Sequence, residues 1–340
     1  MAIRRIQNRI AESRFLLPTT AIIALCICLL AGLVQKQQWI PFLLFAIATY
    51  FFAELNNTNA LLRIYSRTVS SSFMLLTCTI VPLILMEPTP LPPLPKGVGI
   101  GYLFTRQFVN LSTYYMAIAQ LCMILFYYIM FKCYMLRRSA PFAFFGYLMI
   151  GVISTFFVQI LFFVPFLWIL TATNLRTLHV KSFIASCLGL ITPYWLGGAY
   201  LMISGEFNRF TDHFVGLITF QPLFDYTAIN EHQFVTFALV AILAITGIIH
   251  FFRHSYLDKI RIRMLYEIFI IIDILCILFI VLQPQHYYML MMLIIVNTSP
   301  LIAHFITLTR TRITNIAFLT ILFLVFAVIA YNLWMPSLIF

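Results

Sequence analysis

The sequence predicts an all-α protein, a polytopic transmembrane helical bundle of about eleven spans with its N-terminus inside and its C-terminus outside. Composition is the first observation behind this prediction: of 340 residues, 63% are hydrophobic and only 9% are charged. The second is spacing, since apolar runs of about 20 residues, the length of a spanning helix, recur from end to end. No polar segment is long enough for a separate soluble domain, so we interpret residues 1–340 as one integral membrane domain.

Eleven apolar segments follow one another along the chain. The first comes after four arginines and is followed by no small-residue cleavage site, so we interpret it as an uncleaved signal anchor. Residues 139–175 hold no charge and are too long for one span but short for two, which leaves either two spans or a re-entrant pair. The segments are residues 15–34, 39–55, 69–86, 112–135, 141–157, 159–173, 182–204, 234–252, 268–283, 287–309 and 313–333.

The basic residues predict how these segments are oriented. With the N-terminus inside, 17 of the 21 Lys and Arg residues fall on the cytoplasmic side. This asymmetry follows the positive-inside rule, and it requires residues 139–175 to cross an even number of times. The outside keeps Lys36, Lys96, Arg106 and Arg209, and the inside clusters are residues 4–14, 63–67, 132–138, 176–181, 253–263 and 310–312.

Two long external loops, residues 87–111 and 205–233, share a short motif. FTRQFVNL at residues 104–111 and FTDHFVGL at residues 210–217 are identical at five of eight positions. Both place apolar side chains at i, i+4 and i+7, which is one face of a helix. We therefore predict two external amphipathic surface helices, at residues 102–111 and 210–217. Phe210, Phe214 and Leu217 should face the bilayer or the protein, and Arg209 and Asp212 should face water.

Polar residues of these two helices are the candidate catalytic residues: Arg106, Arg209, Asp212 and His213. Arginines hold a phosphate through bidentate hydrogen bonds, and a carboxylate or a histidine serves as a base. An outward-facing enzyme that acts on a lipid-linked phosphate needs both kinds of group. The alternative is an amphipathic helix with ordinary polar residues on its wet face.

Asp273 and His304 are a predicted intramembrane polar pair. Both lie about five residues from the cytoplasmic ends of adjacent antiparallel segments, which places them roughly 8 Å deep. Ionisable side chains within a bilayer are costly, and they usually face protein or water. We expect a direct contact between the two, which serves either a proton- or ion-coupled site or a structural hydrogen bond between helices.

A cytoplasmic loop provides a further candidate, a lipid-phosphate site at Arg63 and Arg67. Asn56 and Asn57 are positioned to cap a short helix on which these arginines, at i and i+4, share a face. Paired arginines at the membrane interface attract anionic lipid. The alternative is a loop whose charges only set the topology.

Several classes of site are not predicted. All seven cysteines lie inside or at the ends of apolar runs, without zinc-site spacing, so no metal is expected. No phosphate-binding or dinucleotide motif is present, and no cofactor is expected. The net charge of +11 lies in clusters beside apolar runs, which favours membrane lipid over nucleic acid as a partner.

Two stretches carry short signatures: ELNNTNALLRIYSR at residues 54–67 and ITPYWLGGAYLMISGEFNRF at residues 191–210. They are similar to the LN…L-R-S and TPY…G…Y signatures of an uncharacterised multi-pass inner-membrane protein family of Bacteroidota, in the same order. The resemblance covers roughly the central two-thirds of the chain. It implies a bacterial inner-membrane protein, and it assigns no catalytic residues because that family has no established activity.

The leading hypothesis is a part in cell-envelope biogenesis, in which a lipid-linked or membrane-embedded substrate is handled at the outer leaflet beneath the two surface helices. One alternative is a proton- or ion-coupled transporter that uses Asp273 and His304. Another is a non-catalytic scaffold. The expected partners are membrane lipids, with a lipid-linked substrate or other envelope proteins.

Overall fold

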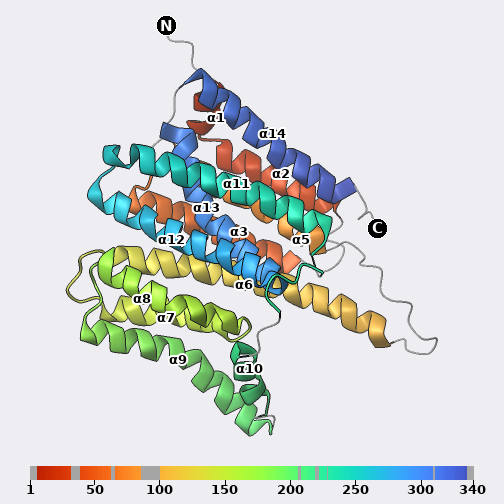
Figure 1. The fold of residues 1–340 in the computed structure, drawn as a ribbon, viewed down its shortest axis with the longest axis vertical. Helices are drawn as coiled ribbons and strands as arrows, with labels where there is room; N and C mark the ends of the chain where they lie inside the picture. The colour runs from red at the N-terminus through yellow and green to blue at the C-terminus, as the bar shows by residue number, and fades with distance from the viewer. Residues whose placement is uncertain are drawn as a thin grey trace.

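The computed structural model describes residues 6–31, 39–62, 66–85, 100–205, 208–218, 222–227, 229–308 and 311–334, with the backbone alone described at residues 39, 85, 100–111 and 208–209. These residues form helices joined by turns, and no strand occurs among them (Figure 1). The predicted all-α class is therefore confirmed.

Each of the eleven predicted segments contains a helix or a pair of helices. Seven helices among the described residues are long and apolar enough to cross a membrane, so a multi-pass helical membrane protein is confirmed. The other apolar helical segments are shorter, and the predicted number of eleven spans is not confirmed. In chain order the helices are α1 (Ile6–Ala11), α2 (Leu16–Leu30), α3 (Trp39–Asn59), α4 (Thr68–Cys78), α5 (Ile80–Leu85), α6 (Ile100–Lys132), α7 (Ala140–Ser154), η2 (Val158–Phe163), α8 (Val164–Thr173), α9 (Val180–Ile203), α10 (Asn208–Ile218), α11 (Glu231–His254), η3 (Ser255–Leu257), α12 (Ile260–Leu282), η4 (Pro284–His286), α13 (Tyr287–Leu308) and α14 (Arg312–Trp334).

Helix α13 lies at the centre of the larger of two groups of helices. It packs against α12, α11, α4 and α6, and 94% of its most apolar window is buried inside the protein. A helix that is apolar on every side is typical of such a position. The polar side chains of α13, among them Asn297, Thr298 and His304, are therefore buried in protein rather than in lipid.

A second group consists of α7, α8 and α9, which lie beside α6 in the lower part of Figure 1. Helices α7 and α9 approach closely through glycines. A Cβ atom on Gly151 would stand 2.7 Å from the Leu190 carbonyl oxygen, and one on Gly189 would overlap the Phe144 carbonyl oxygen. Small residues allow this kind of approach between membrane helices.

Residues 139–175 form a hairpin, with α7 running out and η2 and α8 running back. Its two ends meet, since the Ser139 hydroxyl donates to the Thr177 carbonyl oxygen at 2.8 Å. Helix α7 has 15 residues, which rise about 22 Å against a hydrocarbon thickness of about 30 Å. The polypeptide thus leaves one end of the bundle along α7 and returns to the same end along η2 and α8, both of which are short. The charge pattern requires such a return.

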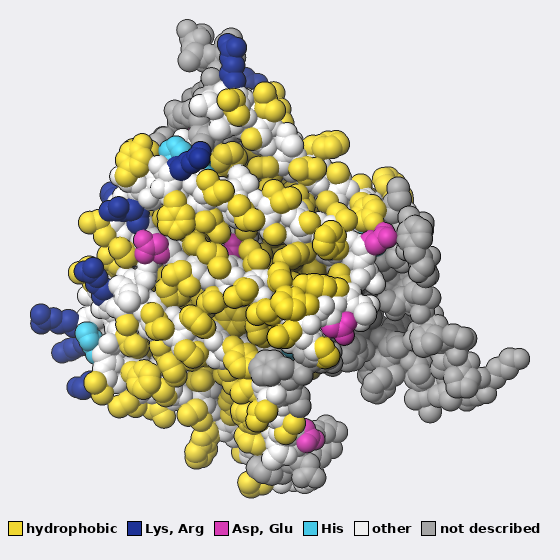
Figure 2. Space-filling view, in the orientation of Figure 1, with side chains coloured by type: hydrophobic (Ala, Val, Ile, Leu, Met, Phe, Trp, Pro, Cys, Tyr) yellow, Lys and Arg dark blue, Asp and Glu magenta, His cyan; other side chains and the backbone are white. Residues whose placement is uncertain are grey.

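The turns at residues 133–139, 174–179 and 255–259 lie at one end of the bundle, which we call the basic end. Lys and Arg side chains gather along the left edge of Figure 2, where these turns lie in Figure 1. The sequence predicts this one-sided distribution. That the basic end faces the cytoplasm stays a prediction from the charge rule.

The helix predicted at residues 102–111 is not a separate surface helix. It is the beginning of α6, which continues without a break from Ile100 to Lys132. The join at residues 111–116, LSTYYM, contains neither Gly nor Pro to interrupt a helix. The expectation of two surface helices is therefore corrected to one, α10.

Candidate functional site

Helix α10 forms as a separate short helix after the end of α9. Gly205 follows the end of α9 with φ +74, a left-handed conformation that glycine adopts without strain. The predicted faces of α10 are confirmed where side chains are described. Phe210 and Phe214 pack together with their ring centroids 5.2 Å apart, whereas Asp212 is exposed. Leu217 is half-buried.

One carbonyl group attaches α10 to the tip of the α7 hairpin. The Ser154 carbonyl oxygen lies at the C-terminus of α7, where the last carbonyls of a helix have no partner within it. His213 Nε2 on α10 lies 2.9 Å from this oxygen, and the Tyr194 hydroxyl on α9 donates to it at 3.1 Å. Three elements therefore meet at Ser154.

An apolar groove of about 650 Å³ lies on the side of α10 that faces α9. The α9 wall includes Gly198, where a Cβ atom would stand 3.3 Å from the Phe210 ring. The groove ends among side chains exposed on α9, such as Trp195 at 77% and Met202 at 66%. Its lining includes Leu161, Ile191, Tyr194, Gly198, Phe210 and Phe214.

A more polar pocket of about 500 Å³ lies on another side of α10. Its walls come from α6, from residues 156–159 at the tip of the hairpin of residues 139–175, from α10, and from η4 and the beginning of α13. The Gln159 amide donates to the Gly216 carbonyl oxygen at 3.4 Å, which joins the hairpin tip to α10. The polar side chains that line the pocket are Ser112, Gln159, Asp212, His213, Gln285 and His286.

His213 and Tyr194 are neighbours in space that line different cavities. Tyr194 lines the apolar groove and His213 lines the polar pocket, with their ring centroids 5.9 Å apart. Because a carbonyl oxygen only accepts, His213 donates through Nε2–H, and in the neutral tautomer that this bond requires Nδ1 is the proton acceptor. A histidine held in this way has the chemistry of a general base, and Asp212 lines the same pocket.

The structure brings together only part of the predicted catalytic set. Asp212 and His213 line one pocket. Arg106 and Arg209 lie on α6 and α10, two of the helices that form the pocket walls, but their side chains lie outside the described residues. Sequence reasoning missed the other polar residues among the described lining: Ser112, Gln159, Gln285 and His286. They belong to α6, η2 and η4, and only the fold brings these three elements next to α10.

Asp273 and His304 are not in contact, and this prediction is wrong. Helix α12 begins at Ile260, so Asp273 stands 13 residues, or about 20 Å, along it rather than five. The Asp273 carboxyl group instead accepts from the Thr298 hydroxyl at 3.0 Å, deep inside the protein. His304 Nε2 lies 2.8 Å from Asp258 Oδ2 and belongs to another cluster.

The cytoplasmic arginine pair is only partly described. Arg63 lies outside the described residues, and Arg67 precedes α4 with a buried Nε that has no hydrogen-bond partner among them. Asn56 belongs to the end of α3 rather than to a helix cap, because α3 continues to Asn59. The Asn56 amide donates to the Ser70 hydroxyl at 2.8 Å and joins α3 to α4. Lipid-phosphate binding by the arginines stays a prediction.

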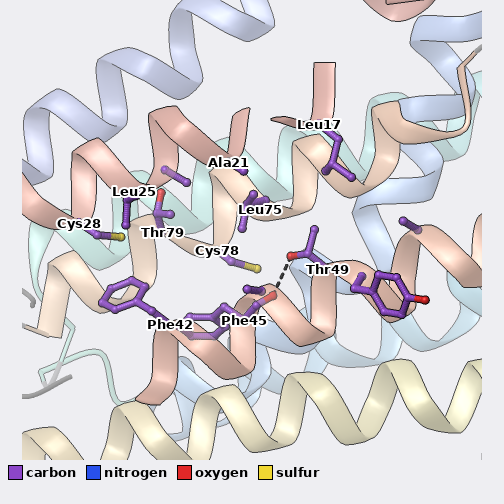
Figure 3. Close-up of a pocket in the computed structure, with 14 residues that line it drawn as sticks. Leu17, Ala21, Leu25, Cys28, Phe42, Phe45, Thr49, Leu75, Cys78 and Thr79 are labelled. Atoms are coloured by element: carbon purple, nitrogen blue, oxygen red, sulfur yellow. Dashed lines mark hydrogen bonds between the residues drawn. The ribbon is translucent and has the colours of Figure 1, made fainter. Parts of the chain in front are cut away.

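A third cavity, of about 300 Å³, lies between α2, α3 and α4 (Figure 3). Its walls are apolar, with Leu25 and Cys28 on α2, Phe45 on α3 and Leu75 on α4. The Thr49 hydroxyl bonds to the Phe45 carbonyl oxygen at 2.7 Å and so is satisfied within its own helix. The cavity is lined almost entirely by apolar side chains and is unlike the more polar pocket beside α10.

Comparison of the chain with protein-family models, curated proteins and solved structures finds no match.

Proposed function

We propose that this protein holds an amphiphilic, lipid-linked substrate at α10, with its apolar chain in the groove against α9 and its polar head group in the pocket against α13. One observation carries the proposal: α10 contributes Phe210 and Phe214 to an apolar groove, and Asp212 and His213 to a second, more polar pocket. An amphiphile is the class of molecule that fills both, since each part of it requires the matching surroundings.

The same geometry supports a chemical role for the head-group end. His213 is fixed by the Ser154 carbonyl group, so its proton acceptor Nδ1 is oriented before any ligand arrives. Asp212 lies on the neighbouring position of α10 and is exposed. We propose these two as the groups that act on the bound head, and Arg106 and Arg209 as the cations that hold a phosphate there.

The location is part of the proposal. The resemblance of residues 54–67 and 191–210 to a Bacteroidota inner-membrane family supports a bacterial inner membrane. The charge distribution supports an outward-facing α10, because 17 of 21 basic residues fall on the opposite side. A substrate handled at the outer leaflet belongs to cell-envelope biogenesis.

Photolabelling of two neighbouring glycine variants tests the proposal. The probe is a polyprenyl phosphate with a diazirine in its chain, added to the protein in nanodiscs of phosphatidylethanolamine and phosphatidylglycerol. In Gly198→Phe the new ring fills the groove, because a Cβ atom there already meets the Phe210 ring. Gly197→Phe is the matched control, since a Cβ atom at Gly197 meets nothing within 4 Å.

The expected result is labelling of α9 and α10 peptides in the wild type and in Gly197→Phe, with at least a tenfold loss in Gly198→Phe. A diazirine phosphatidylglycerol run in parallel distinguishes a lipid-linked substrate from any bilayer lipid. Equal labelling of the two glycine variants, or labelling confined to the cavity between α2 and α3, overturns the proposal.

A further inference from the structure

Three side chains form a connected row at the basic end of the bundle, on the far side of the protein from α10. Asp258 follows η3, His304 lies near the end of α13 and His250 lies near the end of α11. Asp258 Oδ2 lies 2.8 Å from His304 Nε2, and His304 Nδ1 lies 3.3 Å from His250 Nδ1. Both contacts are within hydrogen-bond range, so the three groups form one connected chain.

The fold places the two histidines together through a glycine. A Cβ atom on Gly247 would stand 2.8 Å from the Leu301 side chain, so α11 and α13 touch there. His250 and His304 each come three residues later on these helices, almost one turn further toward the basic end. The contact between the rings therefore follows from the closest approach of the helices.

The three side chains differ in how far they are exposed. The Asp258 side chain is 15% exposed, whereas His304 is 1% exposed and His250 is 6% exposed. His250 Nε2 is fully buried and has no hydrogen-bond partner among the described residues. The three groups thus connect a carboxylate that solvent reaches, Asp258, with an imidazole nitrogen that is buried in the protein, His250 Nε2.

The groups around this chain are few. His254, on α11, stacks on His250 with ring centroids 4.3 Å apart, and its Nδ1 bonds to the His250 carbonyl oxygen at 3.1 Å. Tyr266, on α12, packs its ring against His304, while its hydroxyl group donates to the Leu61 carbonyl oxygen at 3.4 Å. Asp258, His304 and His254 are the ionisable groups that act electrostatically on His250.

The hydrogen bonds allow two arrangements of protons. With Asp258 ionised, His304 donates through Nε2–H, so its Nδ1 accepts from His250 Nδ1–H and His250 Nε2 is a bare lone pair. With one more proton, Asp258 is a neutral acid that donates to His304 Nε2. His304 then donates through Nδ1–H, and His250 carries its proton on Nε2.

We propose that Asp258, His304 and His250 form a proton-transfer chain between solvent at the basic end and the interior beside α13. A proton that arrives at His250 Nε2 releases the Nδ1 proton of His250 to His304 Nδ1. The Nε2 proton of His304 then moves to Asp258, and the reverse sequence delivers a proton inward. Each step breaks one N–H or O–H bond and forms another, and both imidazoles are neutral before and after. No oxidant or second reactant is needed.

Nitrogen NMR of the whole protein tests this chain. The protein is labelled with ¹⁵N-histidine, placed in nanodiscs, and followed from about pH 8 to about pH 4, the range in which imidazoles and carboxyl groups titrate. The expected result is a concerted exchange of tautomers: His304 changes from Nε2–H to Nδ1–H while His250 changes from Nδ1–H to Nε2–H, at the same midpoint.

Two variants make the result decisive. Asp258→Asn cannot accept the proton, so both rings should keep one tautomer over the whole range. His254→Gln removes an imidazole that stacks on the chain but is not part of it, so the concerted exchange should remain. Separate midpoints for His304 and His250, or an imidazolium at His304 paired with Asp258, would overturn the proposal. So would an unchanged exchange in Asp258→Asn.

Discussion

His213 and Tyr194 bond to the same acceptor, the Ser154 carbonyl oxygen, at 2.9 and 3.1 Å. The two side chains come from α10 and α9, and the acceptor comes from the tip of the α7 hairpin. This shared acceptor helps to hold α10 in place, and it is available because the C-terminal carbonyl of α7 has no partner within its own helix.

Loss of the His213 side chain should loosen α10 without unfolding the protein. His213→Ala removes one hydrogen bond, for which about 0.5–1.5 kcal/mol is typical. Amide hydrogen exchange across Asn208–Ile218 should accelerate roughly 2- to 10-fold, the ratio that this energy corresponds to. Tyr194→Phe should have a similar effect, whereas Val215→Ala, at a side chain 52% exposed, is the control. Unchanged exchange in both donor variants would contradict this attachment.

Asp273 should be coupled to Thr298 and not to His304. A double-mutant cycle of Asp273→Asn with Thr298→Val should give a coupling of about 0.6–1.7 kcal/mol, the range for polar pairs between membrane helices. The cycle of Asp273→Asn with His304→Gln should give nearly zero, because the two side chains have different partners. Unfolding by SDS in mixed micelles measures both. A larger coupling to His304 would show that the geometry around Asp273 is wrong.

A methyl group should have opposite effects at two glycines of α9. Gly189→Ala overlaps the Phe144 carbonyl oxygen on α7, where the backbone cannot give way. We expect a loss of about 1–3 kcal/mol from overpacking. Gly197→Ala meets nothing within 4 Å and should stabilise α9 by about 0.5–1 kcal/mol through helix propensity. Thermal unfolding in one detergent compares the two, and equal shifts would falsify the close packing of α7 on α9.

Reporter fusions test the orientation of the whole bundle. Reporters within residues 87–111, within residues 205–233 and at Phe340 should read external. A cytoplasmic reading at Phe340 would mean that one segment is miscounted, most directly within residues 139–175. The fusions that should read cytoplasmic follow Arg67, Arg138, Lys181, Arg263 and Arg312, because these positions close the basic clusters.

Helix type and position could be read from the sequence because hydrophobic length in a membrane is a strong constraint. Every predicted segment contains a helix, and the amphipathic face of α10 follows directly from Phe210 and Phe214. The first and last residues of the helices are harder to predict from the sequence. Helix α12 begins eight residues before the predicted start at residue 268, since IRIRMLYE continues the helix despite its charges.

That difference accounts for the error at Asp273. Eight additional residues move the carboxyl group about 12 Å along the helix, from the level of His304 to that of Thr298. The sequence also does not predict which residues of distant segments become neighbours in space. Nothing in the spacing of His250, Asp258 and His304 indicates a chain, because it depends on how closely α11 approaches α13 at Gly247.

The apolar groove beside α10 ends among Trp195, Met202 and other α9 side chains that the protein leaves uncovered. In a bilayer these side chains meet lipid, so a ligand reaches the groove by lateral diffusion rather than from water. Its effective concentration is then its mole fraction in the membrane, and part of the entropy cost of association is met when it partitions there. Occupancy should therefore follow the lipid-to-protein ratio of a sample and be nearly independent of its aqueous volume.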